Sequence, residues 1–200
     1  MGNGIDWKIG VYDTIIGYET YEAGNNPNFT RSWGYAVEPT QHTGILGTYR
    51  ISDNIAIAAG LANTHAAGIN LRNTESADWP NYDGYWHKAW MASIAVTAPN
   101  DCGFLSGSTL YAGVVSGFVG GTEDQDNYYV GATLNTPVAG LKAGVAFDYV
   151  ENKGGNDGLG NYKDDAWVVG VYASYQATEK LSLHGRAEYG DNKYDANWGG

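Results

Sequence analysis

The residues that could do chemistry in this chain are scattered and do not form a complete catalytic motif. The sequence contains no GxSxG, HExxH or P-loop pattern. Its four histidines, His42, His65, His87 and His184, fall on different expected strands and loops. His87 and His184 share the inward-facing parity of their strands, so a Ser-His-Asp hydrolase site near the strand ends remains an alternative. Polar lining is the favoured role for both, and we expect no enzyme activity.

Metal and disulfide sites have equally little support. Cys102 is the only cysteine, which excludes an internal disulfide, and no Cys/His zinc spacing is present. Residues 151–165, ENKGGNDGLGNYKDD, are rich in Gly, Asp and Asn and loosely resemble calcium-binding turns. One imperfect copy favours a surface loop over a calcium site. We therefore predict no metal and no cofactor.

The remaining candidates are polar side chains on strand-like segments near the C-terminus. They are Lys142, Asp148, His184, Arg186 and Glu188, and all five have the inward parity of their segments. In a water-filled lumen, opposed charges set a transverse field and tune selectivity. In a small barrel of about eight strands, the same charges would pair with each other and fill the interior. The excess of acids favours cations.

The segments that must position these residues alternate strictly between apolar and polar side chains. Over residues 141–149, Leu141, Val145 and Phe147 point one way, whereas Lys142 and Asp148 point the other. Residues 181–189 repeat the pattern, with Leu183 and Tyr189 opposite Arg186 and Glu188. A period of two over about ten residues indicates a β-strand with one apolar face. We expect the apolar face to meet lipid and the polar face to meet a lumen.

Similar segments cover the rest of the chain and predict about nine strands without helices. The expected strands are 5–12, 32–51 as one long strand bent at Pro39, 54–63, 85–98, 109–119, 128–135, 141–150, 166–176 and 181–189. Between them we expect a long loop at 16–31, a polar loop at 64–84, a connection at 99–107 and a linker at 122–126; residues after 189 are loop-like. Short turns fall at one end of the strands, and long polar loops fall mostly at the other.

Composition agrees with a membrane-facing β-sheet but also with a soluble one rich in tyrosine. The 200 residues include 16 Tyr and 7 Trp but only 4 Phe, and rings with a polar end suit a membrane–water interface. The net charge of −11 makes nucleic acid an unsuitable partner. No apolar run is long enough for a transmembrane helix. No signal peptide is visible, so we expect a mature portion or a fragment.

Residues 16–63, IGYETYEAGNNPNFTRSWGYAVEPTQHTGILGTYRISDNIAIAAGLAN, resemble the OmpL-like family of outer-membrane β-barrel porins. The points of likeness are the IGYE…NPNFTRS loop, the PTQHTG segment that leads into a strand, and the later YQATEKLSLHGRAEYG. The resemblance implies a Gram-negative outer-membrane barrel that passes small solutes. Family members are longer and carry a signal peptide and a terminal strand, so we expect this chain to lack both ends.

Together these features predict an all-β protein, an antiparallel up-and-down transmembrane β-barrel or partial barrel of about 8–10 strands. Residues 1–200 would form a single β-barrel domain, complete or lacking its final strands. The predicted function is passive diffusion of small hydrophilic solutes across the bacterial outer membrane. The alternatives are a non-conducting barrel that acts as an anchor or adhesin, and a soluble all-β binding domain. The expected partners are the lipid bilayer and the solutes, and the oligomeric state is left open.

Overall fold

The computed structural model describes residues 4–63, 65, 88–120, 123–153 and 164–193. Its strands are β1 (Ile5–Asp13), β2 (Gln41–Arg50), β3 (Ile55–Ala62), β4 (Ala89–Thr97), β5 (Thr109–Gly120), β6 (Glu123–Asn135), β7 (Leu141–Asn152), β8 (Asp164–Thr178) and β9 (Leu181–Lys193). Helical elements in the described residues are short: α1 (Trp33–Val37) and the 3₁₀ turns η1 (Ala23–Asn25) and η3 (Gly103–Leu105). None of these helices is long and apolar enough to cross a bilayer.

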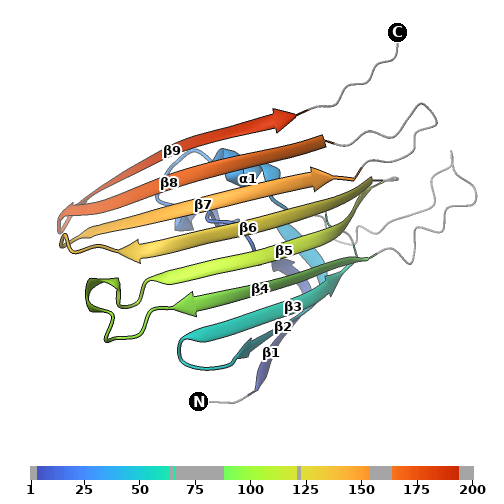
Figure 1. Ribbon diagram of the computed structural model, residues 1–200, viewed down its shortest axis with the longest axis horizontal. Coiled ribbons are helices and arrows are strands. Elements are labelled where there is room, and N and C mark those ends of the chain that lie inside the picture. The colour runs from blue at the N-terminus through green and yellow to red at the C-terminus, as the bar shows by residue number, and fades with distance from the viewer. Residues whose placement is uncertain (1–3, 64, 66–87, 121–122, 154–163, 194–200) are drawn as a thin grey trace, which may run out of the picture.

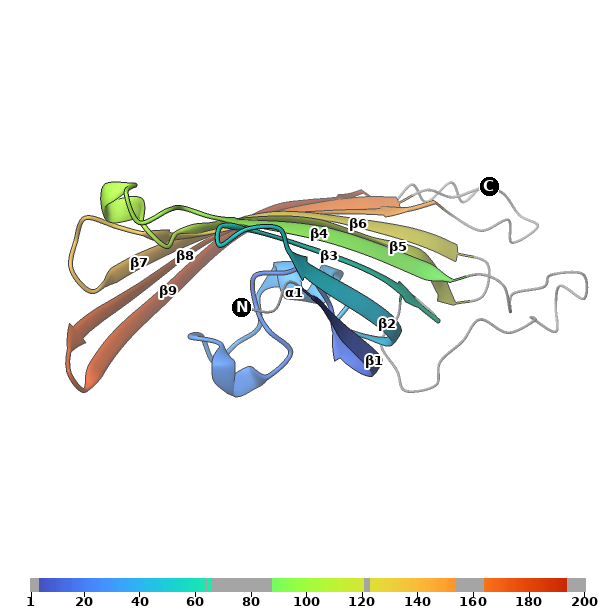
Figure 2. The ribbon, with the colours of Figure 1, turned by 90° about the horizontal axis from the view of Figure 1, so that it is seen from below.

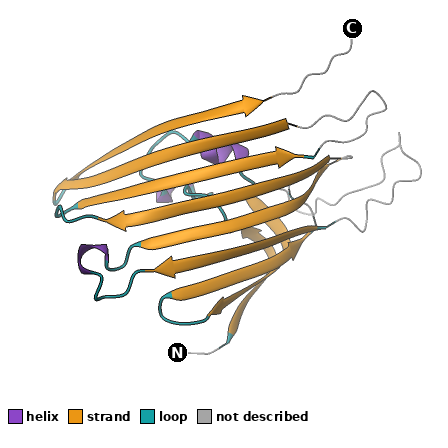
Figure 3. Ribbon diagram, viewed as in Figure 1, coloured by secondary structure: helices purple, strands orange, loops and turns teal. Residues whose placement is uncertain are grey.

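The nine strands form one sheet in which every strand pairs antiparallel with the next one along the chain (Figure 1). Figure 3 shows the same sheet with its connections, which are short loops and turns at one end of the strands. The up-and-down order and the strand number confirm the predicted fold class. Within the described residues β1 and β9 remain the two edges of the sheet, and closure into a barrel is not seen.

The sheet is strongly curved, and the connection between β1 and β2 lies under the arch (Figure 2). We call residues 14–40 the inner segment; it contains η1 and α1. The segment leaves β1 and returns to β2 at the end of the sheet opposite the short turns, yet it folds back along the concave face instead of extending away. The predicted loop at 16–31 is thus an ordered part of the interior.

The expected strand over residues 32–51 is wrong in its first half. Residues 33–37 form α1, and β2 begins only at Gln41. Ser32 caps the helix by accepting a hydrogen bond from the Tyr35 N–H at 2.9 Å, and Pro39 disfavours helical backbone at the residue before it. The alternation of Trp33, Tyr35 and Val37 therefore occurs in a short helix that is bounded by a cap and a proline.

Two further boundaries differ from the sequence prediction. The expected linker at 122–126 belongs largely to β6, which begins at Glu123 and pairs with β5 and β7. The expected loop after Tyr189 continues as β9 to Lys193, since Asp191, Asn192 and Lys193 pair with residues of β8. Polar residues populate both strand ends because those ends lie beyond the apolar part of the sheet.

Side chains on the convex face form continuous apolar rows across the sheet. One row joins Ile9, Ile45, Leu61 and Trp90 on four neighbouring strands, and all four are exposed. A second row joins Val130, Phe147, Val169 and Tyr189 on β6 to β9. Cross-strand pairs of this kind stabilise a sheet, and exposed apolar surface of this extent is typical of a site that contacts a membrane or another protein.

The concave face carries the hydrophobic core, which packs between the sheet and the inner segment. Its buried members include Tyr12, Ile16, Leu46, Met91 and Val115. Close approach between β2 and β3 needs a glycine at position 44, because an added Cβ would overlap the carbonyl oxygen of Leu61 and lie 2.7 Å from the Cα atom of Ala62. Both atoms belong to the backbone, so they cannot move aside without shifting β3.

We predict that Gly44→Ala destabilises the folded protein by about 1–3 kcal/mol, the usual cost of overpacking. The measurement is the urea dependence of unfolding in detergent micelles. Gly185→Ala is the matched control, since a Cβ at that strand position meets nothing within 4 Å. Equal stability of the two variants would contradict the packing of β2 against β3.

Candidate functional site

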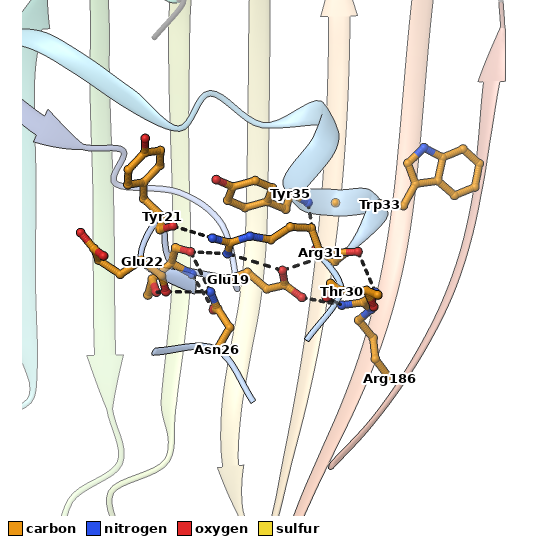
Figure 4. Close-up of polar contacts among 12 residues, drawn as sticks. Glu19, Tyr21, Glu22, Asn26, Thr30, Arg31, Trp33, Tyr35 and Arg186 are labelled. Atoms are coloured by element: carbon orange, nitrogen blue, oxygen red, sulfur yellow. Dashed lines mark hydrogen bonds and ion pairs between the residues drawn. The ribbon is translucent and has the colours of Figure 1, made fainter. Parts of the chain in front are cut away.

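Arg186 on β9 clamps the inner segment to the sheet (Figure 4). Its guanidinium donates to Glu19 Oε1 at 2.7 Å, to the carbonyl oxygens of Thr30 and Arg31 at 2.6 and 2.7 Å, and to Thr30 Oγ1 at 3.2 Å. Its Nε lies 2.9 Å from Glu188 Oε2. A guanidinium has five N–H donors, and these five contacts use all of them.

Glu188 holds the start of α1. Its Oε1 accepts hydrogen bonds from the backbone N–H groups of Trp33 at 2.7 Å and Gly34 at 3.4 Å. The first N–H groups of a helix have no partner within it, and a carboxylate is favourable there. Glu19 acts beside it by accepting the Ser32 N–H at 3.1 Å. The helix start is therefore fixed to the wall formed by β9.

Asn127 on β6 holds the other end of α1. Its Nδ2 donates to the carbonyl oxygen of Val37 at 2.8 Å, while its Oδ1 lies 2.8 Å from His65 Nε2 and accepts from Gln125 Nε2 at 2.7 Å. Burial lowers the pKa of His65 to about 4, so the imidazole is neutral at pH 7. With its ends tied to β6 and β9, α1 crosses β7 and β8.

The tip of the inner segment is closed by its own side chains. Arg31 donates to the carbonyl oxygens of Thr20 and Tyr21, and its guanidinium stands 4.2 Å from the centre of the Tyr35 ring. Asn26 accepts from the Thr20 N–H and donates to the Thr20 carbonyl, both at 2.9 Å. These contacts make residues 20–31 a compact loop, which lies under the curved sheet (Figure 2).

Stacked aromatic rings join the segment to the strands. The Tyr18 and Tyr172 rings are 3.9 Å apart and 16° from parallel. Gly144 on β7 leaves space for the Tyr18 ring, because a Cβ at this position would overlap the Tyr18 hydroxyl. Beside these rings a groove of about 220 Å³ remains, and its lining includes Lys142 and Ser174. The segment thus fills part of the concave side and leaves a groove beside Lys142.

A pair of carboxyl groups lies under α1. Glu38, the residue after the helix, is hydrogen bonded through its side chain to Asp148 on β7. Asp148 is only 3% exposed. Burial raises the pKa of Glu38 well above its usual range, and the hydrogen bond and charge of Asp148 raise it further.

The five residues predicted as lumen-lining candidates all lie on the concave face, but they differ in their surroundings. Arg186 and Glu188 belong to the clamp, and Asp148 is buried beneath α1. Lys142 and His184 are exposed nearer the short turns. His184 Nδ1 lies 2.9 Å from Ser174 Oγ, but no carboxylate among the described residues is hydrogen bonded to this histidine. His87 and most of the 151–165 segment lie outside the described residues. Among the residues that the structure describes, no group of three His, Cys, Asp or Glu side chains could hold a metal ion.

Four residues of the inner segment that contribute to the site were not predicted from the sequence: Glu19, Arg31, Ser32 and Glu38. A signal for the helix was present, because Ser32 marks a cap and Pro39 marks a stop, and they bound the five-residue helix Trp33–Val37. Nothing in the local pattern marks Glu19, whose main partner is 167 residues away.

The family of the chain follows from a comparison with protein-family models. The model described as putative beta-barrel porin-2, OmpL-like, matches residues 1–198. The chain belongs to this β-barrel porin family. No curated protein and no solved structure matches it. The resemblance seen at residues 16–63 is therefore confirmed and extends over almost the whole chain, and in this porin the inner segment lies on the concave face of the sheet.

We predict that Arg186→Met releases the inner segment. Glu19, with a side chain only 2% exposed, would lose its closest cation, and breaking such a buried pair costs about 3–5 kcal/mol. Tryptic cleavage after Arg31, measured by mass spectrometry of the folded porin, should accelerate roughly 200- to 5,000-fold if that energy keeps the segment docked, since about 1.4 kcal/mol corresponds to a factor of ten.

Lys142→Met is the matched control, because it removes a cation from the same face and Lys142 is exposed outside the clamp. Its cleavage rate should stay that of the parent. Equal rates for the two variants would show that Arg186 does not hold the segment.

Proposed function

We propose that this porin lets small hydrophilic solutes diffuse passively across the bacterial outer membrane, with the inner segment narrowing the path. Residues 1–200 would act as a single β-barrel domain, without a catalytic step. The observation that carries the proposal is the position of the inner segment, a polar loop held by charged side chains on the concave face of a porin-family sheet.

The convex face supports a bilayer as the partner. Its central rows are apolar, and aromatic residues lie towards both strand ends: Trp90, Tyr128, Tyr149, Trp167 and Tyr189 near one end, and Trp7, Tyr49 and Tyr175 near the other. An apolar band between two aromatic girdles is the lipid-facing pattern of outer-membrane barrels. A soluble sheet would leave the same surface in water.

The concave face supports an aqueous interior. The clamp brings two acids and two arginines together, Glu19 and Glu188 with Arg31 and Arg186. Opposed charges at a narrowing create a transverse field that favours polar solutes over apolar ones. Lys142 and His184 remain exposed on the same face, so we propose that they line the path, while Asp148 supports α1 from below.

A second candidate is a barrel that the segment closes completely, which would serve as an anchor and conduct nothing. The buried core between the segment and β1–β8 favours this alternative. The two candidates differ in one property, the current that the parent chain passes while its inner segment is intact.

For the bilayer, we predict that Val145→Arg destabilises the protein by about 2–4 kcal/mol, the cost of a cation near the middle of the lipid-facing side. Val145 is exposed on the convex face. His184→Arg places the same side chain on the concave face and should cost far less. Unfolding by urea in phospholipid vesicles measures both. Similar losses would argue against a lipid-facing convex side.

For diffusion, we predict stepwise currents when the chain is reconstituted in planar bilayers, and larger steps when residues 22–28 are replaced by two glycines. Removing the tip widens the path, while the clamp residues stay in place. Absence of steps in the parent, with steps in the shortened variant, would favour the closed barrel. Absence in both would refute the porin proposal.

A further inference from the structure

We propose that Glu38 and Asp148 share one proton and form a latch that keeps α1 docked on the concave face and releases it as the pH rises. The proposal concerns the docking of the inner segment and holds whether or not the barrel conducts. It assigns a role to two acids that the clamp does not use, the buried Asp148 and the half-buried Glu38.

Contact between the two carboxyl groups is favourable only when the pair holds a proton. The two side chains are hydrogen bonded to each other, and an ionised carboxylate is only an acceptor. One of the two groups must therefore be protonated to donate. Asp148 is only 3% exposed, and its Oδ1 has no hydrogen-bond partner in the described structure. If both carboxyl groups were ionised, no partner in the described part of the chain would stabilise the second negative charge of the pair.

No cation neutralises the pair within the described residues. Arg186 uses its five N–H groups on Glu19, Glu188 and the segment backbone. Arg31 is engaged with Glu19, two carbonyl groups and the Tyr35 ring. Neither forms an ion pair with Glu38 or Asp148.

Two glycines bring the backbone close against the carboxyl groups. A Cβ at Gly34 would lie 2.6 Å from Asp148 Oδ2, and one at Gly17 would overlap the carboxyl of Glu38. Gly34 belongs to α1 and Gly17 to the first part of the inner segment. The pair thus touches both halves of the segment, so a change in its charge acts directly on how the segment docks.

The groups around the pair are acidic or neutral. They are Glu19 from the segment, Tyr129 from β6, Tyr172 from β8 and Glu188 from β9. Burial, Asp148 and Glu19 all raise the pKa of Glu38. A group whose pKa is raised in the docked state contributes its full stabilisation below its ordinary value, near 4.5 for glutamate, and loses it as the pH rises through the raised value. Docking therefore weakens towards alkaline pH.

The test measures the position of α1 with two spin labels and does not depend on current. Cysteines replace Ala36, an exposed residue of α1, and Glu179, an exposed residue of the short turn after β8, in a Cys102→Ser background. Pulsed electron resonance on the reconstituted chain gives the distance distribution from about pH 5 to about pH 9. We expect a narrow distribution at the lower pH and a broader, longer one at the higher pH.

Glu38→Gln should abolish the change, because the amide donates to the Asp148 carboxylate at every pH and keeps the distribution narrow. Asp148→Asn makes the same bond from the other side and serves if Glu38→Gln does not fold. Glu22→Gln, at an exposed acid of the same segment, should behave like the parent. A parent distribution that does not change with pH, or a Glu38→Gln distribution that broadens like the parent, would overturn the proposal.

Discussion

The antiparallel backbone ladder is the constraint on which the rest of this porin depends. Every strand from β1 to β9 exchanges hydrogen bonds with its neighbours in sequence, which leaves few backbone groups to satisfy elsewhere. Register along the ladder also decides which residues share a face, because side chains alternate with a period of two. The apolar rows and the clamp are both products of that alternation. Since β1 and β9 run in the same direction, they cannot pair antiparallel with each other, which agrees with the open edges.

The concave face shows how a polar segment can be held inside a barrel wall. Burying Glu19 alone would be costly, but Arg186 supplies a partner, and the segment backbone, Thr30 Oγ1 and Glu188 occupy the remaining donors of that guanidinium. Glu188 then uses its free oxygen for the N–H groups of α1. Each of these side chains contacts at least two partners, so a network of hydrogen bonds and ion pairs holds the segment in place. Such a network is cooperative, and the Glu38–Asp148 pair adds an element that depends on a proton.

Much of the sheet could be predicted from sequence because its signals are local. Residues 141–149 alternate so regularly that both the strand and its two faces follow from residue types alone, and β7 pairs over that range as expected. The errors have local causes as well. Residues 33–37 alternate like a strand but are capped by Ser32, and the polar ends of β6 and β9 resemble loops because they lie beyond the apolar band. Propensity and hydrophobicity were overridden there by a cap and by strand pairing.

The sequence by itself determined the family, the antiparallel sheet and the facing of residues such as Leu183 and Arg186, since these depend on period and composition. Only the tertiary structure decided what the inward-facing residues do. Arg186 and Glu188 were expected to line a lumen, but they hold a segment about 155 residues earlier in the chain. Asp148 was expected to face water, but it is buried against Glu38. Such partners meet because the β1–β2 connection folds back under the arch, and no local pattern encodes a contact between residues so far apart in sequence.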